Sequence, residues 1–287
     1  MLCFFVSDLH GSIFRYQKLF ELLEHEKPEA LFMGGDLLPS DVYYIMNRDY
    51  NHYVLDFLIP EFKRLRDRLG VSFPRIFLIL GNDDSRRDEE LFIKGDAYGL
   101  WTYIHNKKVE FDDYIVYGYS YVPPSPFKLK DWERYDVSRY VDPGCLSPED
   151  GWYSIEVPEE EKRYATIRND LEALTGNDSL KKAIFLFHGP PYLTSLDRAG
   201  LDGYMIDHVP LDVHIGSLAM KKFIELRQPL LTLHGHIHES SRLTGSWRDK
   251  IGTTHAFNAA HDGLELSLIR FDPAHLNDAS RELIKDY

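Results

Sequence analysis

The chain has 287 residues, of which 44% are hydrophobic and 14% aromatic, enough to bury a sizeable core in one large or two small domains. The formal net charge of −13 disfavours nonspecific binding to duplex nucleic acid or anionic lipid, because those affinities come largely from cations that neutralise phosphates. No stretch approaches the roughly 20 apolar residues that cross a bilayer. A small phosphorylated substrate is compatible with this charge if bound metal ions supply positive charge locally.

The opening MLCFFVSDLH lacks the basic start of a signal peptide and is typical of a buried strand. The two cysteines, Cys3 and Cys145, are far apart in the sequence, so we expect two free thiols in a reducing cytoplasm. These observations predict a cytoplasmic protein that does not use a membrane as a partner.

The first third of the chain alternates short apolar runs with helical patterns. Strands are predicted at 2–7, 30–35 and 75–80. Ser12 is a candidate cap for a helix that Pro28 ends, and the helical pattern over 50–69 should kink or split at Pro60. The order β-α-β-α-β favours a largely parallel sheet that is covered by helices.

The pattern changes near residue 109, where two paired strands are predicted around a turn at Asp112–Asp113. The segment 123–158 then has no regular period and is long for a plain connection, so we interpret it as a candidate cap insertion. One helix is expected after Pro158, with Gly176 as its stop. Further elements are predicted at 181–191, 217–227 (a helix), 228–236 and in the C-terminal runs THAFNAA and LELSLIRF. No linker divides the chain, which favours a single domain over 1–287 with two stacked sheets.

Polar side chains suited to metal binding follow the apolar runs, each beside a glycine or a turn. They are Asp8, His10, Asp36, Asn82, Asp83, Asp84, His188, His236 and His238. In open α/β sheets, sites form at the carboxyl ends of the strands, so these segments can converge in space. Glycine beside a ligand lets the backbone turn sharply and leaves room for an ion.

Imidazole and carboxylate groups together suit two divalent transition-metal ions such as Mn, Fe, Zn or Ni, and one carboxylate can bridge the pair. Two such ions produce a hydroxide nucleophile near neutral pH and neutralise charge on a phosphoryl group. Two ions held by these residues could therefore hydrolyse a phosphoester through metal-bound hydroxide.

The motifs Asp8-x-His10, Gly35-Asp36, Gly81-Asn82, His188 and Gly235-His236-x-His238 resemble, in this order, the five motifs of the calcineurin-like metallophosphoesterase family. The segments HGPPYLTSLDRAG and LHGHIHES further resemble a poorly characterised prokaryotic branch. The resemblance implies that Asp8, His10 and His238 hold one metal. It also implies that Asn82, His188 and His236 hold a second, with Asp36 bridging both. The implied fold is an α/β (α+β) sandwich of two stacked mixed β-sheets flanked by helices.

One position departs from the family pattern, which has histidine after Gly-Asn where this chain has Asp83. An aspartate beside two cations stays ionised at pH 7 and is a poor general acid. Asp84 matches the acidic residue that orients the family histidine, but here that histidine is missing. We group Asn82, Asp83 and Asp84 as candidate catalytic residues and expect diesters or activated monoesters to be favoured. Asp83 is equally compatible with a solvated turn.

Several other residues can be interpreted either as structural or as part of the site. His234 matches no family ligand and is interpreted as a packing residue or one that orients a ligand. Asn258 is expected in a turn or behind the ligands. Surface charge is the default for three arginines that could contact phosphate, Arg86, Arg87 and Arg198. A satellite core is favoured over a substrate shelf for the aromatic residues Phe127, Trp132, Tyr135, Tyr140, Trp152 and Tyr153.

Two alternative functions compete with this one. A metallo-β-lactamase-like hydrolase would show H-x-H-x-D-H, but His238 is followed by Glu239 and Ser240. A metal-binding scaffold or regulatory protein of the same fold, with little catalytic activity, stays open because such a protein can keep its metals. Scaffold relatives that have lost ligands would show gaps among the seven ligand positions, and this chain has none.

Overall fold

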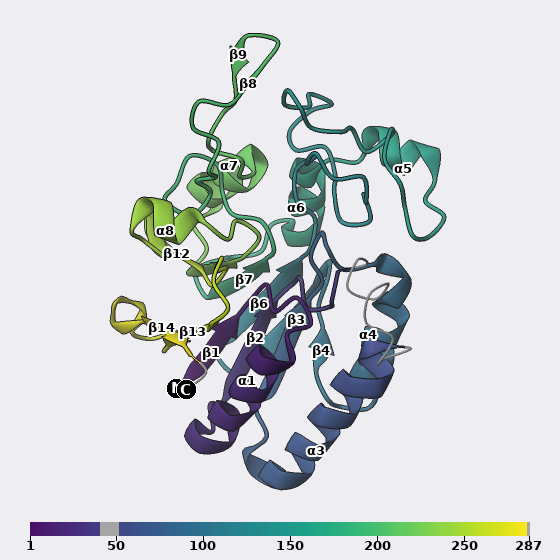
Figure 1. Cartoon of the computed structure of the whole chain (residues 1–287). Coiled ribbons are helices and arrows are strands. Elements are labelled where there is room, and N and C mark those ends of the chain that lie inside the picture. The colour runs from purple at the N-terminus through teal and green to yellow at the C-terminus, as the bar shows by residue number, and fades with distance from the viewer. Residues whose placement is uncertain (41–51, 286–287) are drawn as a thin grey trace.

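The computed structural model describes residues 1–40 and 52–285, and its centre is a sandwich of two six-stranded sheets (Figure 1). The first sheet contains, in spatial order, β14 (Ser280–Ile284), β13 (Leu266–Phe271), β1 (Cys3–Val6), β2 (Ala30–Gly34), β3 (Arg75–Ile79) and β4 (Thr102–Tyr103). The second contains β11 (Arg248–Ile251), β12 (Thr254–Asn258), β10 (Leu231–His234), β7 (Ala183–Phe187), β6 (Tyr114–Tyr119) and β5 (Lys107–Phe111).

Each sheet has four neighbouring parallel strands. In the first sheet these are β1 to β4, and β13 and β14 continue antiparallel beyond β1. In the second sheet β12, β10, β7 and β6 run parallel between the antiparallel edges β11 and β5. The predicted parallel β-α-β-α-β start and the hairpin at Asp112–Asp113 are confirmed.

Helices cover the sheets on their outer faces. They are α1 (Ile13–Glu26), α3 (Ile59–Leu69), α4 (Glu89–Ala97), α5 (Glu159–Tyr164), α6 (Ile167–Thr175), α7 (Leu218–Arg227) and α8 (Ser240–Thr244). Ser12 caps α1 as predicted, its hydroxyl accepting from the backbone N–H of Arg15. Pro60 lies in the first turn of α3, directly after a π-helix over Val54–Leu58, while residues 50 and 51 of the predicted helix lie outside the described residues. No helix of 1–40 or 52–285 combines the length and apolar character that a membrane span requires.

Side chains alternate between two packed layers along the buried strands. Phe5 and Phe32 face the second sheet, and Phe32 meets Phe111 across the sandwich with ring centroids 6.1 Å apart. Phe4 and Leu31 point the other way, into the cluster that includes buried residues of α1 and α3. Because both faces are covered, these strands are continuous apolar runs whose ends carry the polar residues.

The chain after Pro158 forms two short helices where one was expected. Thr166 adopts an extended backbone and caps α6 by accepting from Asn169, while the N–H of Ile167 donates to the carbonyl of Tyr135. This pairing with the segment 123–158 interrupts the helix, whereas Gly176 ends α6 as predicted.

The aromatic residues of 123–158 range from buried to exposed, with Tyr153 between the extremes, so the expected satellite core is only partly correct. Trp132 and Tyr135 are buried, and Trp132 belongs to the main core cluster. Phe127, Tyr140 and Trp152 are 63%, 67% and 49% exposed. The segment is thus anchored by some of its aromatic side chains and presents others to solvent.

Candidate metal centre

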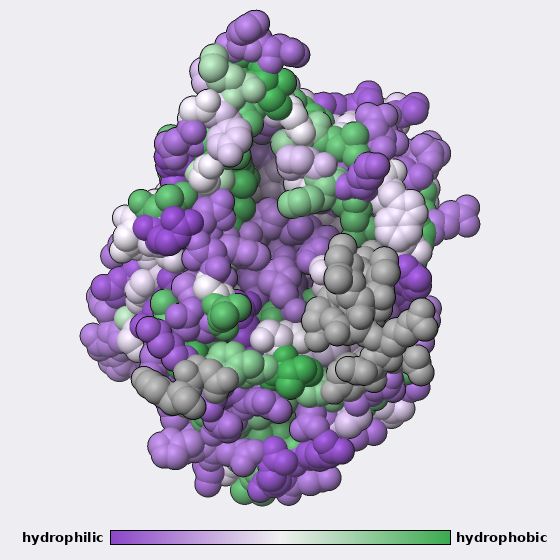
Figure 2. Space-filling model, viewed as in Figure 1, coloured by the Kyte–Doolittle hydropathy of each residue, from purple (hydrophilic) through white to green (hydrophobic). Residues whose placement is uncertain are grey.

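The candidate ligands lie just beyond the carboxyl ends of strands from both sheets. Asp8, His10, Asp36 and Asn82 follow β1, β2 and β3 of the first sheet, and His188, His236 and His238 follow β7 and β10 of the second. In the view of Figure 2, hydrophilic side chains gather in a hollow at the middle of this face, over the ends of β1, β2 and β3.

The backbone at these turns is unusual. Four of the seven candidates have positive φ, namely Asp8 (56°), His10 (46°), Asp36 (51°) and His236 (72°). Residues other than glycine rarely adopt this conformation, and such strain collects at functional sites. The turns also approach one another closely, because a Cβ on Gly81 would lie 2.3 Å from Oδ1 of Asp36.

A first group of donor atoms comes from Asp8, His10, Asp36 and His238, which all lie within 4.8 Å of one another. The Nε2 atoms of His10 and His238 are 3.1 Å apart, and His238 Nε2 is 3.1 Å from Oδ1 of Asp8. Oδ2 of Asp36 is 3.9 Å from His10 Nε2. Two imidazole nitrogens and two carboxylates therefore converge on one point, which is a suitable donor set for a transition-metal ion.

A second group contains Asp36, His188 and His236. The Nδ1 atom of His188 lies 2.8 Å from the carbonyl oxygen of Gly34, so its Nε2 faces Asp36 Oδ2 at 3.3 Å and Asn82 Oδ1 at 3.0 Å. A backbone carbonyl that holds one ring nitrogen leaves the other free to bind a metal. Asp36 is common to both groups, and the described residues contain no further group of this kind.

The electrostatics of the two groups favour positive charge. Burial opposes ionisation of Asp8, but the hydrogen bond with His238 and the charges of His238 and His188 together outweigh burial and lower the pKa of the carboxyl to about 2. Burial likewise disfavours charge on His188, yet the neighbouring Asp36 carboxylate raises the pKa of this imidazole to about 9. The pKa of Asp36 is also held below its usual range, because the nearby histidines overcome its burial. The carboxylates are ionised and attract cations.

Asp84 is fully buried and does not face the hollow. Its carboxylate accepts from the backbone N–H groups of Leu37 (3.1 Å), Leu38 (2.8 Å) and Gly81 (2.9 Å). Burial and the charge of Asp36 raise the pKa of Asp84 to about 7. Asp84 thus ties the turn after β2 to the turn after β3 from a buried position.

Asp83 is more open, with 42% of its side chain exposed. Its backbone N–H donates to Oδ1 of Asp36 over 2.8 Å, and its own Oδ2 lies 3.4 Å from Nδ1 of His10. Asp83 therefore lies at the rim of the first group and touches two of the candidate ligands.

His234 and Asn258 lie behind the ligands. The Nδ1 atom of His234 is 2.8 Å from the carbonyl oxygen of Gly189, the residue after His188, and its ring stacks on Phe187. The amide of Asn258 donates to the carbonyl of Leu196. Sequence reasoning missed Arg15, whose guanidinium donates to the carbonyl of Asp8 over 2.6 Å. An arginine in the first turn of a helix gives no sequence signal of such a contact.

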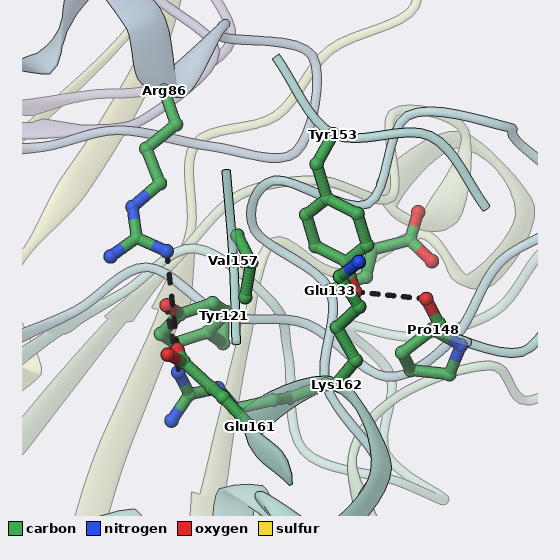
Figure 3. Close-up of a pocket in the computed structure, with 9 residues that line it drawn as sticks. Arg86, Tyr121, Glu133, Pro148, Tyr153, Val157, Glu161 and Lys162 are labelled. Atoms are coloured by element: carbon green, nitrogen blue, oxygen red, sulfur yellow. Dashed lines mark hydrogen bonds and ion pairs between the residues drawn. The ribbon is translucent and has the colours of Figure 1, made fainter. Parts of the chain in front are cut away.

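Of the three arginines considered for phosphate binding, Arg86 and Arg198 have side chains engaged elsewhere, whereas Arg87 is exposed. Arg198 donates to Asp202, and the backbone N–H of Arg87 donates to Ser154. Arg86 stacks over Trp132 and points toward Glu161 in a small polar cavity of about 10 Å³, room for about one water molecule (Figure 3). That cavity lies within the contact between Arg86 and the segment 123–158, outside both groups of ligands.

The segment 123–158 is bound to the turn that carries Asn82. Asp131 accepts from the backbone N–H groups of Arg86 (2.7 Å) and Ser154 (2.8 Å). Farther along, Asp136 accepts from the N–H of Leu218 at the start of α7. These contacts fix the segment beside the metal centre.

The family model described as calcineurin-like phosphoesterase matches residues 1–240, so the chain belongs to the calcineurin-like phosphoesterase family. Comparison with curated proteins gives no match. Among solved structures, TT1561 of Thermus thermophilus is 15% identical with a TM-score of 0.55, over 99% of both chains. A dimetal phosphatase from Danio rerio is 11% identical with a TM-score of 0.51, over 94% of this chain and 91% of that one. At these identities the two structures show a shared fold.

Proposed function

We propose that this chain is a dinuclear metal-dependent phosphoesterase. The observation that carries the proposal is the position of Asp36, whose carboxylate belongs to both groups of donor atoms. One carboxylate can bridge two ions about 3.5–4 Å apart, and such pairs occur in many phosphatases and nucleases. Mixed imidazole and carboxylate donors suit Mn, Fe, Zn or Ni.

Each ion would draw ligands from both sheets. Asp8, His10 and His238 would hold one ion, with Asp36 shared. The other would be held by Asn82, His188 and His236 together with the same carboxylate. When bound, two such ions activate water for attack on phosphorus and neutralise charge on the phosphoryl group. The protein contributes the orientation of these donors, such as His188 held by the Gly34 carbonyl.

The substrate that we propose is a small phosphoester, with diesters or activated monoesters favoured. The family has a histidine acid where this chain has Asp83, and a half-exposed carboxylate at the rim would repel a dianionic monoester more than a monoanionic diester. We further propose that the segment 123–158 acts as a cap that sets substrate choice. We also propose that the protein works in the cytoplasm, where its two free thiols would stay reduced.

The test is a screen of the Mn-loaded full chain against a panel of phosphomonoesters and phosphodiesters, with Asp36→Ala as the metal-site control. We expect turnover that requires added metal and disappears in the control variant. A wild-type protein that binds two ions but turns over no ester faster than Asp36→Ala would support the metal-binding scaffold instead.

A further inference from the structure

Asp83 stands where the family pattern has histidine, and it contacts the first group of ligands in two ways. Its side-chain Oδ2 lies 3.4 Å from Nδ1 of His10, and its backbone N–H donates to Asp36 over 2.8 Å. Both contacts are with candidate ligands. The side chain faces a ligand, which suggests a role different from that of the missing histidine.

A metal-binding histidine uses one ring nitrogen for the ion, and the partner of the other nitrogen fixes its tautomer and orientation. In His188 that partner is the carbonyl of Gly34. In His10 the Nε2 atom lies within the first group, 3.1 Å from His238 Nε2, and Nδ1 points toward Asp83. Asp83 is thus the neighbour of His10 Nδ1, at 3.4 Å, as the Gly34 carbonyl is the neighbour of His188 Nδ1, at 2.8 Å.

The two histidines of the first group are also more exposed than His188 of the second. The side chains of His10 and His238 are 27% and 33% exposed, whereas that of His188 is fully buried. A ligand near solvent has fewer neighbours that restrict its rotation, so an outer partner contributes more to its orientation. His10 therefore depends more on such a partner than His188 does.

We propose that Asp83 is a positioning residue for His10, whose Nδ1–H it accepts, and that it thereby sets the affinity of the outer metal ion. This inference rests on the proposed two-metal site. In this proposal Asp83 supports metal binding indirectly, through His10. The affinity of the other ion, which His188 and His236 would hold, does not depend on Asp83.

The first experiment titrates the metal-free full chain with Mn²⁺ by calorimetry, in wild type, Asp83→Ala and Asp83→Asn. We expect Asp83→Ala to weaken one of two sites by about 10–100-fold and to leave the other unchanged, with Asp83→Asn between them because its amide oxygen still accepts a hydrogen bond. Asp113→Ala is the control, since that side chain is 84% exposed and its ion pair is with Lys182. Equal affinities in wild type and Asp83→Ala, or fewer than two sites in wild type, would overturn the proposal.

The second experiment separates positioning from direct ligation. In the Zn²⁺-loaded protein, NMR of the imidazole nitrogens should show His10 with a proton on Nδ1, assigned by its loss in His10→Ala. That proton signal should shift or vanish in Asp83→Ala, while the corresponding signal of His188 should not move. The proposal is contradicted if wild-type His10 carries its proton on Nε2, or if the His10 Nδ1 proton signal is the same in Asp83→Ala as in wild type. Because both readouts concern binding, a protein that binds two ions and hydrolyses no ester would contradict only the proposed function.

Discussion

Asp84 accepts a hydrogen bond of 2.8 Å from the backbone N–H of Leu38, two residues beyond Asp36. Together with its bonds to Leu37 and Gly81, this contact fixes the turn in which Asp36 adopts a positive φ. Asp84 therefore has a structural role even without the family histidine, because it stabilises the turn that carries the Asp36 carboxylate.

The first prediction is that Asp84→Ala lowers the free energy of unfolding by about 3 kcal/mol or more. The substitution leaves three buried N–H groups without an acceptor, and each such group costs about 1–3 kcal/mol. Asp84→Asn keeps one acceptor oxygen and should cost less. Urea unfolding of the metal-free proteins measures both effects, and a loss below about 0.5 kcal/mol for Asp84→Ala would show that these bonds do not support the turn.

The second prediction concerns metal content. Elemental analysis of a well-loaded sample should find about two transition-metal ions per chain, because both ligand groups are complete. Asp36→Ala should lose both ions, while His188→Ala should lose mainly one. His275→Ala, at a side chain 68% exposed, is the matched histidine control. A wild-type content of one ion would rule out the dinuclear site.

The third prediction is a shift in ester preference on Asp83→His. A positioned acid contributes about 10²–10⁴-fold, mostly for basic leaving groups. At saturating Mn²⁺, the variant should therefore raise kcat/KM for alkyl monoesters more than for diesters, whereas nitrophenyl esters should change little. If the wild type already prefers alkyl monoesters and the variant leaves the ratio unchanged, Asp83 does not govern specificity.

The fourth prediction addresses the cap. The exposed side chains Phe127 and Tyr140 are candidates for substrate contact, whereas Trp132 is core. Phe127→Ser and Tyr140→Ser should change the relative rates across the ester panel and leave the melting temperature nearly unchanged. Leu226→Ser, 82% exposed on α7, is the control. Identical relative rates in all three variants would argue against a cap.

The fifth prediction tests what holds the segment 123–158 in shape. Lys130 and Glu133 form an ion pair with no exposed side-chain surface, and Lys130 also donates to the carbonyl of Ser125. Removing one partner of such a pair costs about 3–5 kcal/mol. We expect that loss in Lys130→Met and a partial recovery in Lys130→Met with Glu133→Leu, measured by urea unfolding. If the double variant is no more stable than Lys130→Met, the unpaired Glu133 carboxylate is not the cause of the lost stability.

The strands that lead to the site could be predicted because their signals are local. The apolar runs before Asp8, Asp36 and Asn82 show buried strands directly, and parallel strands bring their ends together. The polar edge strands β11 and β14 gave no such signal, since edges exposed to solvent carry charged residues. The break before α6 was hidden for another reason, because it depends on Tyr135, about thirty residues earlier.

The finer geometry of the site depends on contacts between distant turns. Nothing near Asp84 indicates that its partners are the N–H groups of Leu37 and Leu38, more than forty residues earlier. The approach of Asp83 to His10 is of the same kind. The candidate ligands could be chosen from residue type and order, but the orientation of each side chain is set by tertiary packing.

The seven candidate ligands come from both halves of the sandwich, so any ion held there would cross-link the two sheets. Occupancy and folding are then thermodynamically linked, because an ion that binds only the folded chain stabilises it by about 2.7 kcal/mol at a hundred times its Kd. Asp36 after β2 and His188 after β7 meet where the two sheets face each other, so an ion held there would add a link between these strands. The cation of the proposed reaction would therefore also stabilise the fold, and we expect the protein to be less stable in a cell that is poor in that metal.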